Sequence, residues 1–438
     1  MKEKKINLLF DASIFANNFA TLDANRSGIF FTAYNVLKEL LKHPEFNVEF
    51  YLGNCDLIPL QNFFKEGLPS GNYKIADIYC ELNMALPKLE HLLEKNRRTK
   101  ERQSQTVFMT IKRTILKVTF QVLKSILGKK LLKRFDIYFS PVHKAPDFIA
   151  KNKKIQKYTI IYDTIPLMPS FIDDKAFYKE HWFYKLIESI NKDDYYFSDS
   201  ENSKQDFIKY VPNIDGNKIT TTLLAASKNF YRCEDKEKNI RIKQKYNIPS
   251  DKKYIFSLCT LEPRKNLIFA IKNFFEFIKK NKIDDLVFVL GGANWYGVLE
   301  KLDELEETKN YKDKIIRAGY IEDEDLASLY SNAKMFVYPT LYEGFGLPPL
   351  EAMQCGCPVI TSNVASIPEV MGDVGIMINP QKDEELVEAY TKLYYNEDLC
   401  KELSQKGMER AKSFSWEKAV NIMFEKMLGN YNTTSHKN

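Results

Sequence analysis

The second half of the chain alternates short apolar runs with segments in which apolar positions recur at a helical period. The apolar runs predict strands at 254–258, 286–290, 315–318, 335–338, 358–361 and 375–378. The periodic segments predict helices at 267–280, 323–331 and 384–395. Strands that alternate with helices in this way form a parallel sheet covered on both faces. We therefore predict a doubly wound α/β domain here.

The first half shows the same alternation less regularly. Its apolar runs predict strands at 6–10, 48–52, 137–140, 159–162 and 195–198, and its periodic segments predict helices at 26–42 and 175–191. The polar stretch 227–238 reads as a linker, so two Rossmann-like domains are expected, at 1–228 and 229–414. Two such domains place a ligand-binding cleft between the carboxyl ends of their sheets.

Composition narrows the class of protein. The chain has 438 residues, 44% of them hydrophobic and 28% charged, as in a water-soluble globular protein. Its 7 cysteines have no regular spacing, which argues against a disulfide framework and favours a reducing compartment. The apolar run near the first residues is too short for a signal peptide, and no run is long enough to span a bilayer. A cytoplasmic location is expected.

The segment 335–351 carries the strongest chemical signal. A buried strand is followed by a loop with Gly344 and Gly346, and a helix then begins with proline in its first turn. The glycines let the backbone approach a ligand, and the helix start offers N–H groups to a diphosphate. Glu343 in the loop and Glu351 one turn inside the helix are both expected to face the cleft.

A second candidate segment, 257–267, joins the first strand of this domain to its first helix. Arg264 and Lys265 would project into the cleft from the carboxyl end of that strand. Two cations suit a diphosphate leaving group, because Arg can bind it through two N–H groups and Lys supplies a point charge. Fixed cations also stabilise the charge that develops as the phosphate departs.

These two segments resemble the Glu-x7-Glu and Glu-Pro-Arg-Lys-Asn motifs of family-4 retaining glycosyltransferases, in a mannosyltransferase-like branch. That family has the GT-B fold, in which two Rossmann-like domains face a cleft and the C-terminal helix, here 415–438, crosses back to the first domain. The resemblance places Glu343 beside the transferred sugar and Glu351 on the ribose hydroxyls. It further implies that the backbone of Phe345, Gly346 and Leu347 lines the sugar and phosphates.

The resemblance also extends to weaker motifs. Gly291 and Gly292 resemble a glycine-rich loop that borders the nucleotide, although an ordinary strand-to-helix turn explains them equally well. Gly28 resembles the glycine that lets the first helix approach the donor phosphates or the acceptor. The branch usually has glycine where Cys259 stands, which leaves the geometry of that loop open.

One first-domain motif departs from the family. Tyr162 replaces the histidine that commonly touches the donor sugar; it can still donate a hydrogen bond but cannot act as a near-neutral base. Asp163 is a candidate for sugar or acceptor contact, with structural capping as the rival role. Ser200 fits the N-cap of a helix, and Trp416 fits a packing residue.

No metal or cofactor is expected. Cys355 and Cys357 lack a second ligand pair, and the acidic residues around Asp323 read better as a helix start than as a metal site. The donor, a nucleotide diphosphate sugar, would be a substrate, and the family needs no metal.

The net charge of +6 is unevenly distributed. Residues 95–134 hold thirteen Lys or Arg and one acidic residue, Glu101. Read as a helix, this segment gathers its apolar residues on one face and has Arg113, Lys117 and Lys124 on the opposite side. Such a helix either contacts an anionic membrane surface or packs into the first domain. No nucleic-acid-binding motif accompanies the charge.

The resemblance thus implies a retaining hexosyltransferase of bacterial surface polysaccharide synthesis, such as that of lipopolysaccharide. The branch favours GDP-mannose as donor, and a glycan or polyprenyl-linked glycan at the inner face of the plasma membrane is the expected acceptor. Two alternatives remain: a nucleotide-sugar epimerase of the same fold, and a non-catalytic scaffold subunit of a glycan assembly complex.

Overall fold

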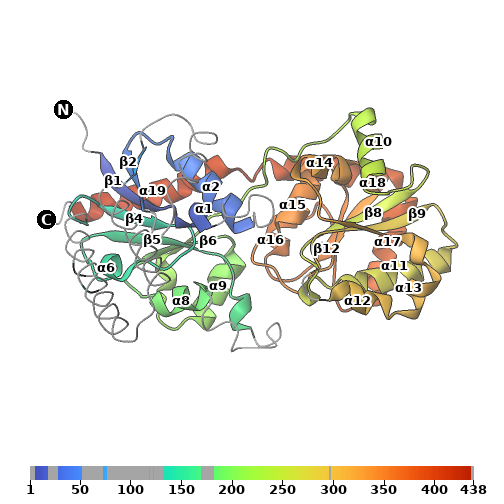
Figure 1. Cartoon of the computed structure of the whole chain (residues 1–438), viewed down its shortest axis with the longest axis horizontal. Helices are drawn as coiled ribbons and strands as arrows, with labels where there is room; N and C mark the ends of the chain where they lie inside the picture. Colours follow the sequence, from blue (N-terminus) through green and yellow to red (C-terminus); the bar gives the residue numbers. More distant parts are fainter. Residues whose placement is uncertain are drawn as a thin grey trace, which may run out of the picture.

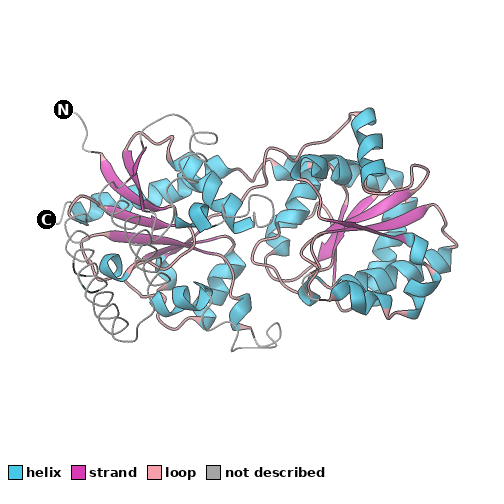
Figure 2. Ribbon diagram, viewed as in Figure 1, coloured by secondary structure: helices cyan, strands magenta, loops and turns pink. Residues whose placement is uncertain are grey.

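The computed structural model describes residues 5–17, 28–51, 73–75, 118, 122, 132–168, 182–294 and 297–435. These residues form two α/β domains that lie side by side (Figure 1). In each domain helices cover both faces of one sheet (Figure 2), and every paired strand is parallel to its neighbours. The predicted doubly wound architecture is confirmed.

The first domain is built on a seven-stranded sheet of order β3-β2-β1-β4-β5-β6-β7. Its strands are β1 (Ile6–Asp11), β2 (Phe46–Tyr51), β3 (Tyr73–Ile75), β4 (Ile137–Ser140), β5 (Gln156–Ile161), β6 (Tyr195–Ser198) and β7 (Ile219–Thr221). Its helices are α1 (Ser13–Asn17), α2 (Gly28–Leu40), α6 (Asp147–Ala150), α8 (Trp182–Ser189) and α9 (Glu201–Tyr210), with short 3-10 turns η1 (Ile165–Leu167) and η3 (Gly216–Lys218).

The second domain is built on a six-stranded sheet of order β10-β9-β8-β11-β12-β13. Its strands are β8 (Lys253–Leu258), β9 (Leu286–Gly291), β10 (Ile315–Gly319), β11 (Met335–Tyr338), β12 (Val359–Ser362) and β13 (Ile376–Ile378). Its helices are α10 (Lys236–Lys245), α11 (Leu267–Asn281), α12 (Val298–Asp303), α13 (Glu306–Asn310), α14 (Asp323–Asn332), α15 (Leu347–Gln354), α16 (Ile367–Met371), α17 (Asp383–Tyr395) and α18 (Glu397–Ala411), with 3-10 turns η4 (Pro263–Lys265) and η5 (Lys312–Lys314). Residues 222–235 join the sheets without helix or strand.

The chain order of both sheets places β8 next to β11 and β1 next to β4. This is the point at which the direction of sheet growth reverses, and ligands of open α/β folds bind beyond the carboxyl ends of the strands there. The loops after β8 and β11 hold Arg264, Lys265 and Glu343.

The last helix returns to the first domain, as predicted. Helix α19 (Trp416–Ser435) lies beside α2, and Val420, Met423 and Met427 are fully buried in the first domain's core. Asn430 Nδ2 donates to Tyr158 Oη of β5 at 3.0 Å. Figure 1 shows this helix in red across the first domain. The two domains are therefore joined by the chain twice.

Candidate active site

A buried ion cluster lies at the carboxyl ends of β8 and β11. Arg264 and Lys265 lie on η4, directly after β8, and Glu343 lies in the loop after β11. Lys265 Nζ lies 2.7 Å from Glu343 Oε1, and Arg264 Nη1 lies 3.0 Å from the same oxygen. The side chains of Lys265, Arg264 and Glu343 are 9%, 15% and 11% exposed, so water screens these charges little. The structure thus brings together three residues predicted for the site.

Glu343 is anchored through one carboxylate oxygen. Oε1 also accepts hydrogen bonds from Thr340 Oγ1 at 2.8 Å and from Tyr338 Oη at 3.0 Å. Oε2 has no partner among the described residues, so it is left to meet a ligand. Burial alone would raise the pKa of Glu343, but Lys265 and Arg264 outweigh it and lower the pKa to about 2. The carboxylate is therefore ionised at any physiological pH.

Glu262 is a member of this cluster that the sequence reasoning missed. Its Oε1 accepts a hydrogen bond from Arg264 and lies 3.9 Å from Lys265 Nζ. Burial disfavours the charge on Arg264, yet Glu343 and Glu262 raise its pKa. Two cations thus face two carboxylates, which holds the side chains in place before any ligand binds. The signal was present, because Glu262 belongs to the quoted Glu-Pro-Arg-Lys-Asn motif.

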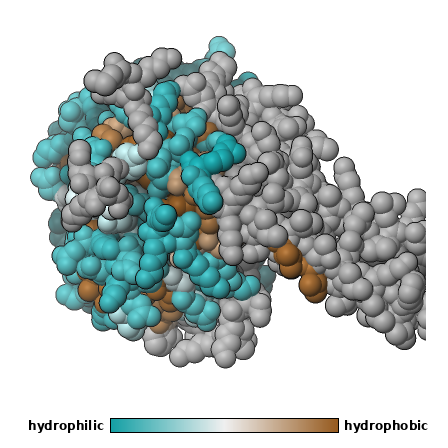
Figure 3. Space-filling view, turned by 90° about the vertical axis from the view of Figure 1, so that its left-hand side faces the viewer, coloured by the Kyte–Doolittle hydropathy of each residue, from teal (hydrophilic) through white to brown (hydrophobic). Residues whose placement is uncertain are grey.

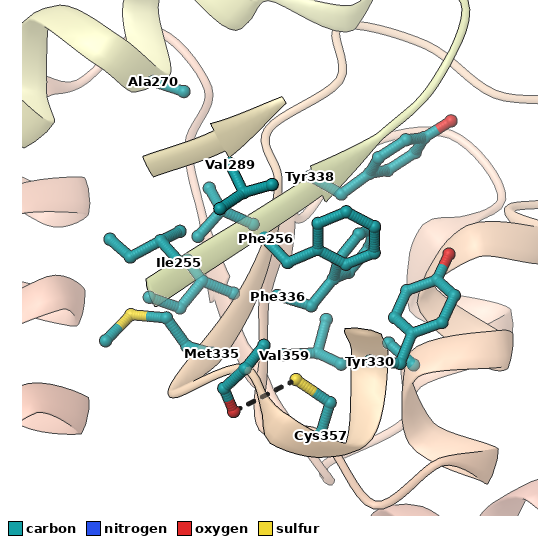
Figure 4. Packing of buried hydrophobic residues seen from close by; sticks show 14 of the residues in the cluster. Ile255, Phe256, Ala270, Val289, Tyr330, Met335, Phe336, Tyr338, Cys357 and Val359 are labelled. Carbon is teal, nitrogen blue, oxygen red and sulfur yellow. Dashed lines mark hydrogen bonds between the residues drawn. The ribbon is translucent and has the colours of Figure 1, made fainter. Parts of the chain in front are cut away.

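Each glutamate of the Glu-x7-Glu motif accepts a hydrogen bond from a tyrosine of the second domain's core. Tyr338 contacts Glu343 as described above, and Tyr330 Oη donates to Glu351 Oε2 at 3.0 Å. In Figure 4 both hydroxyls point out of the same apolar cluster, on the same side of it. Unlike Glu343, Glu351 is not paired with a cation among the described residues, and burial raises its pKa to about 7. The environments of the two carboxylates drive their pKa values apart.

The loop between the glutamates has backbone N–H groups without a hydrogen-bond partner among the described residues. Those of Gly344, Phe345, Gly346 and Leu347 make no hydrogen bond to the described residues. Gly346 has a φ of +111°, which a side chain would strain, and it is the N-cap of α15. Proline at the next two positions after Leu347 removes two further helix N–H groups. The donors available to an anion are therefore those of the loop and of Leu347.

Residues of the first domain lie close to this loop. A methyl group at Gly344 would lie 2.9 Å from Asp163 Cβ and 3.2 Å from Asp199 Oδ2, and one at Gly28 would lie 3.5 Å from Leu347 Cδ1. Asp163 and Gly28 thus meet the second domain beside the predicted donor loop. Asp163 Oδ1 also accepts from Ile165 N at 3.0 Å, which is the capping role considered as its rival. Burial raises the pKa of Asp163 despite the nearby Arg264.

Tyr162 is held within the first domain. Its hydroxyl donates to Pro141 O at 2.8 Å, and it lines a mainly apolar cavity of about 160 Å³ together with Asp163 and Trp182. Ile29 of α2 and Phe207 of α9 complete two further sides of this cavity. The described lining comes from the first domain alone, next to the cluster that contains Glu343.

The glycines of the 290–296 segment have a packing role. A methyl group at Gly292, whose φ is +121°, would lie 1.8 Å from the carbonyl oxygen of Cys259, and one at Gly291 would lie 2.5 Å from Ile321. Cys259 N in turn donates to Gly291 O at 3.2 Å. These contacts hold the segment after β8 against the end of β9. Trp295 and Tyr296 lie outside the described residues.

Cys259 and the acidic residues around Asp323 are two further features that the sequence singled out. Cys259 is buried and is not among the residues with positive φ, so the backbone does not require the glycine usual in the branch. The acidic helix start of α14 has Glu322 as its N-cap, and the buried Asp325 accepts a hydrogen bond from Tyr246 Oη at 2.8 Å. The Asp-x-Asp pattern thus belongs to a helix start packed against α10.

The basic segment 95–134 lies largely outside the described residues. Within it, Val118 and Val122 are 57% and 52% exposed, and Arg134 pairs with Glu49 at 2.5 Å. Figure 3 shows the end of the first domain, where the described residues are mainly hydrophilic with small separate hydrophobic patches. Among the described helices none combines the length and hydropathy needed to cross a membrane.

Comparison with known proteins places the chain in a family. The model of the family "Glycosyl transferases group 1" matches residues 238–410, which include Arg264, Lys265, Glu343 and Glu351. "O-antigen chain mannosyltransferase B" of Escherichia coli is 32% identical over 283 residues, covering 64% of this chain and 72% of that protein.

Two further relatives show how far the similarity extends. "Serotype-specific mannosyltransferase WbdA" of Escherichia coli is 31% identical over 61% of this chain, and the chain spans about a third (32%) of that protein. Among solved structures, Anabaena Alr3699/HepE in complex with UDP and glucose has a TM-score of 0.63 at 12% identity, and the match covers 97% of this chain and 100% of that one. The chain therefore belongs to the group 1 glycosyl transferases, in their mannosyltransferase-like branch, and has their GT-B fold.

Proposed function

We propose that this protein transfers a hexose from a nucleotide diphosphate sugar to a glycan acceptor in the synthesis of a bacterial surface polysaccharide. The observation that carries the proposal is the anchored Glu343. It is ionised, is held through Oε1 by Lys265 and Arg264, and lies beside a loop whose N–H groups are unpaired among the described residues. Negative and positive recognition elements are thus fixed side by side, as a sugar attached to a diphosphate requires.

Each part of the donor has a suitable partner. The diphosphate would be bound by Arg264, Lys265 and the N–H groups of 344–347, because all of these donate hydrogen bonds and two carry charge. Glu343 Oε2 would accept a hydroxyl of the sugar. Glu351 in its ionised form would accept the two ribose hydroxyls. The mannosyltransferase relatives favour GDP-mannose as donor.

The cluster also supports a mechanism with retention by front-face attack. In this mechanism the acceptor hydroxyl attacks the anomeric carbon on the side from which the diphosphate leaves, and the departing phosphate oxygen takes the proton. Arg264 and Lys265 would stabilise the charge that builds up on that oxygen. A carboxylate with a pKa of about 2 is a weak base, so Glu343 is poorly suited to take the proton itself.

The acceptor would bind to the first domain. The cavity beside Asp163 and Trp182 lies next to the donor cluster, and an aromatic wall with one carboxyl group suits a sugar ring. For a polyprenyl-linked acceptor, the cationic segment 95–134 would contact the anionic inner face of the membrane. The exposure of Val118 and Val122 within it is consistent with an apolar contact face.

A panel of nucleotide sugars tests the function directly. Thermal shift with GDP-mannose, UDP-glucose and the free nucleotides identifies the donor base, and turnover is then measured with and without glycan acceptors. We expect donor-dependent stabilisation, acceptor-dependent transfer with retained anomeric configuration, and loss of turnover in Glu343→Ala. Conversion of the donor without an acceptor would instead indicate an epimerase, and melting that ignores every nucleotide would indicate a scaffold subunit.

A further inference from the structure

Three consecutive carbonyl groups of the donor loop (residues 343–347) lie within hydrogen-bond distance of serine hydroxyls. Ser366 Oγ lies 2.9 Å from Glu343 O and 2.8 Å from Phe345 O, within the second domain. The carbonyl between them, Gly344 O, is reached from the first domain by Ser200 Oγ at 2.6 Å and Ser203 Oγ at 3.2 Å. All three serines are fully buried.

This arrangement determines where the loop N–H groups point. In a trans peptide the C=O and the following N–H point in opposite directions across one plane. Fixing Gly344 O against Ser200 and Ser203 therefore aims Phe345 N–H away from α9. Ser366 does the same for the N–H groups of Gly344 and Gly346. The first domain thus sets the direction of one of the loop's N–H groups.

The second domain in turn binds the N-terminal end of α9. The N–H groups of Glu201 and Asn202, in the first turn of α9, donate to Glu369 Oε2 and Oε1, both at 2.8 Å. First-turn N–H groups have no partner within their own helix, and the helix dipole favours an anion there. Glu369 of α16 therefore supplies both the missing acceptors and the favourable charge.

A third contact also joins α9 to the second domain. Asn202 Nδ2 donates to Tyr342 Oη at 2.9 Å, one residue before Glu343. On the other side of the loop Gly344 leaves no room for a side chain between Asp163 and Asp199. The donor loop is consequently part of the interface between the two domains.

We propose that the N-terminal end of α9 is a latch that orders the donor loop when the two domains are docked, with Ser203 and Glu369 as positioning residues. The proposal rests on the proposed function of the loop as a diphosphate-binding element. When the domains separate, Gly344 O loses both hydroxyls and Phe345 N–H loses its fixed direction. Donor affinity and domain docking are then coupled, so each favours the other.

The test measures nucleotide affinity and domain docking in the same variants. Ser203→Ala removes a hydroxyl from Gly344 O while Ser200 still caps α9, and Glu369→Gln removes the charge and one acceptor from the helix end. Their matched controls are Ser404→Ala, which removes a hydroxyl from the distant Gly356 O, and Glu385→Gln, which weakens a carboxylate contact to Asn379 N within the second domain.

We expect the dissociation constants of GDP and UDP, by calorimetry, to rise about tenfold in Ser203→Ala and Glu369→Gln and to stay at the wild-type value in the controls. By small-angle scattering, Glu369→Gln without nucleotide should have a larger radius of gyration than wild type, and saturating nucleotide should reduce it. If Gly344→Ala folds, it should show both effects, since its methyl group opposes the contact.

Two results would overturn the latch. One is wild-type nucleotide affinity in Ser203→Ala and Glu369→Gln while Arg264→Ala abolishes binding, because the donor site would then be real but independent of α9. The other is a radius of gyration that neither Glu369→Gln nor nucleotide alters. A wild-type chain that binds none of the nucleoside diphosphates, whatever their base, would overturn the proposed function itself, and the coupling with it.

Discussion

Lys265 Nζ donates to Glu343 Oε1 at 2.7 Å although 78 positions separate the two residues in the chain. The contact joins the loop after β8 to the loop after β11, the two central strands of the second sheet. Both side chains are almost fully buried, and Arg264 adds a second cation to the same carboxylate. Removing one member leaves unpaired charge in a poorly hydrated place, so the pair dominates the behaviour of the site.

Replacement of Glu343 by alanine should reduce stability and activity together. The change leaves Lys265 and Arg264 without their shared carboxylate, for which we expect a loss of about 3–5 kcal/mol in the free energy of unfolding. Glu343→Gln keeps the shape and should retain more stability, yet lower kcat/KM by about a hundredfold through a misplaced donor. Denaturant unfolding and initial rates measure the two effects.

Glu402→Ala is the matched control for this change, because Glu402 forms an exposed ion pair with Lys406. It should leave both the unfolding free energy and kcat/KM at their wild-type values. Full activity in Glu343→Gln would be incompatible with a role for this carboxylate beside the transferred sugar.

The low pKa of Glu343 predicts a specific loss of stability in acid. Its pKa is about 2 in the folded protein against 4.5 for the ordinary group, so folding favours the ionised form. The resulting stability is complete above pH 4.5 and is lost as the pH falls towards 2. Unfolding free energies measured between pH 6 and 3 should therefore fall more steeply in wild type than in Glu343→Gln. Parallel curves would show that the cluster does not bias this carboxyl.

Glu351 should make nucleotide binding depend on pH near neutrality. Its pKa is raised to about 7, so the free protein holds a proton there at lower pH. Because the ribose hydroxyls need an ionised acceptor, affinity for GDP or UDP should increase as the pH rises through 7 and level off above it. Without ligand, the free energy of unfolding should change in the opposite direction. It should decrease as the pH rises from 4.5 to 7.

Calorimetric titration at a series of pH values measures this dependence. In Glu351→Gln affinity should be lower throughout and should no longer change around pH 7. A wild-type affinity that is constant from pH 6 to 8 would contradict the assignment of Glu351 to the ribose.

Gly292→Ala should displace the loop that carries Arg264 and Lys265. Its methyl group would overlap the carbonyl oxygen of Cys259 at 1.8 Å, and its φ of +121° disfavours any side chain. We expect a loss of more than about 1 kcal/mol in unfolding free energy and weaker nucleotide binding. Gly429→Ala is the control, because nothing lies within 4 Å of its methyl position in α19. That substitution should instead stabilise the helix by about 0.5–1 kcal/mol.

Much of the fold was predictable because parallel strands buried on both faces are continuous apolar runs. The bounds of β4, β6 and β11 agree with the predicted 137–140, 195–198 and 335–338. Strands β3 and β7 were missed because neither is a continuous apolar run: the first contains Lys74 and the second ends in two threonines. Helix 175–191 is described only as α8, since 169–181 lie outside the described residues.

The site was predictable where a motif is local and unpredictable where partners are distant. Glu343, Arg264 and Lys265 were found from their spacing and their place after strands. Tyr330, Tyr338 and Ser366 look like ordinary core or turn residues in the sequence. Asp199 gives no signal there either, although its buried Oδ1 has no hydrogen-bond partner within the described part of the chain. The glycines 291 and 292 were open between two roles, and only the folded contacts show why neither position has room for a side chain. Gly291 faces Ile321, and Gly292 faces the carbonyl oxygen of Cys259.

By itself the sequence determined the strand and helix alternation and the residue types offered to a diphosphate sugar, because periodicity and short motifs are local properties. The return of the last helix was expected only from the resemblance to GT-B enzymes. Tertiary structure decided the charge states and the pairing. Glu343 and Glu351 are the same chemical group with seven residues between them. Their pKa values differ because cations from the loop after β8 stabilise the charge on Glu343, whereas burial disfavours the charge on Glu351. It also decided that α9 of the first domain completes the loop of the second, since hydrogen bonds between distant segments exist only once the chain has folded.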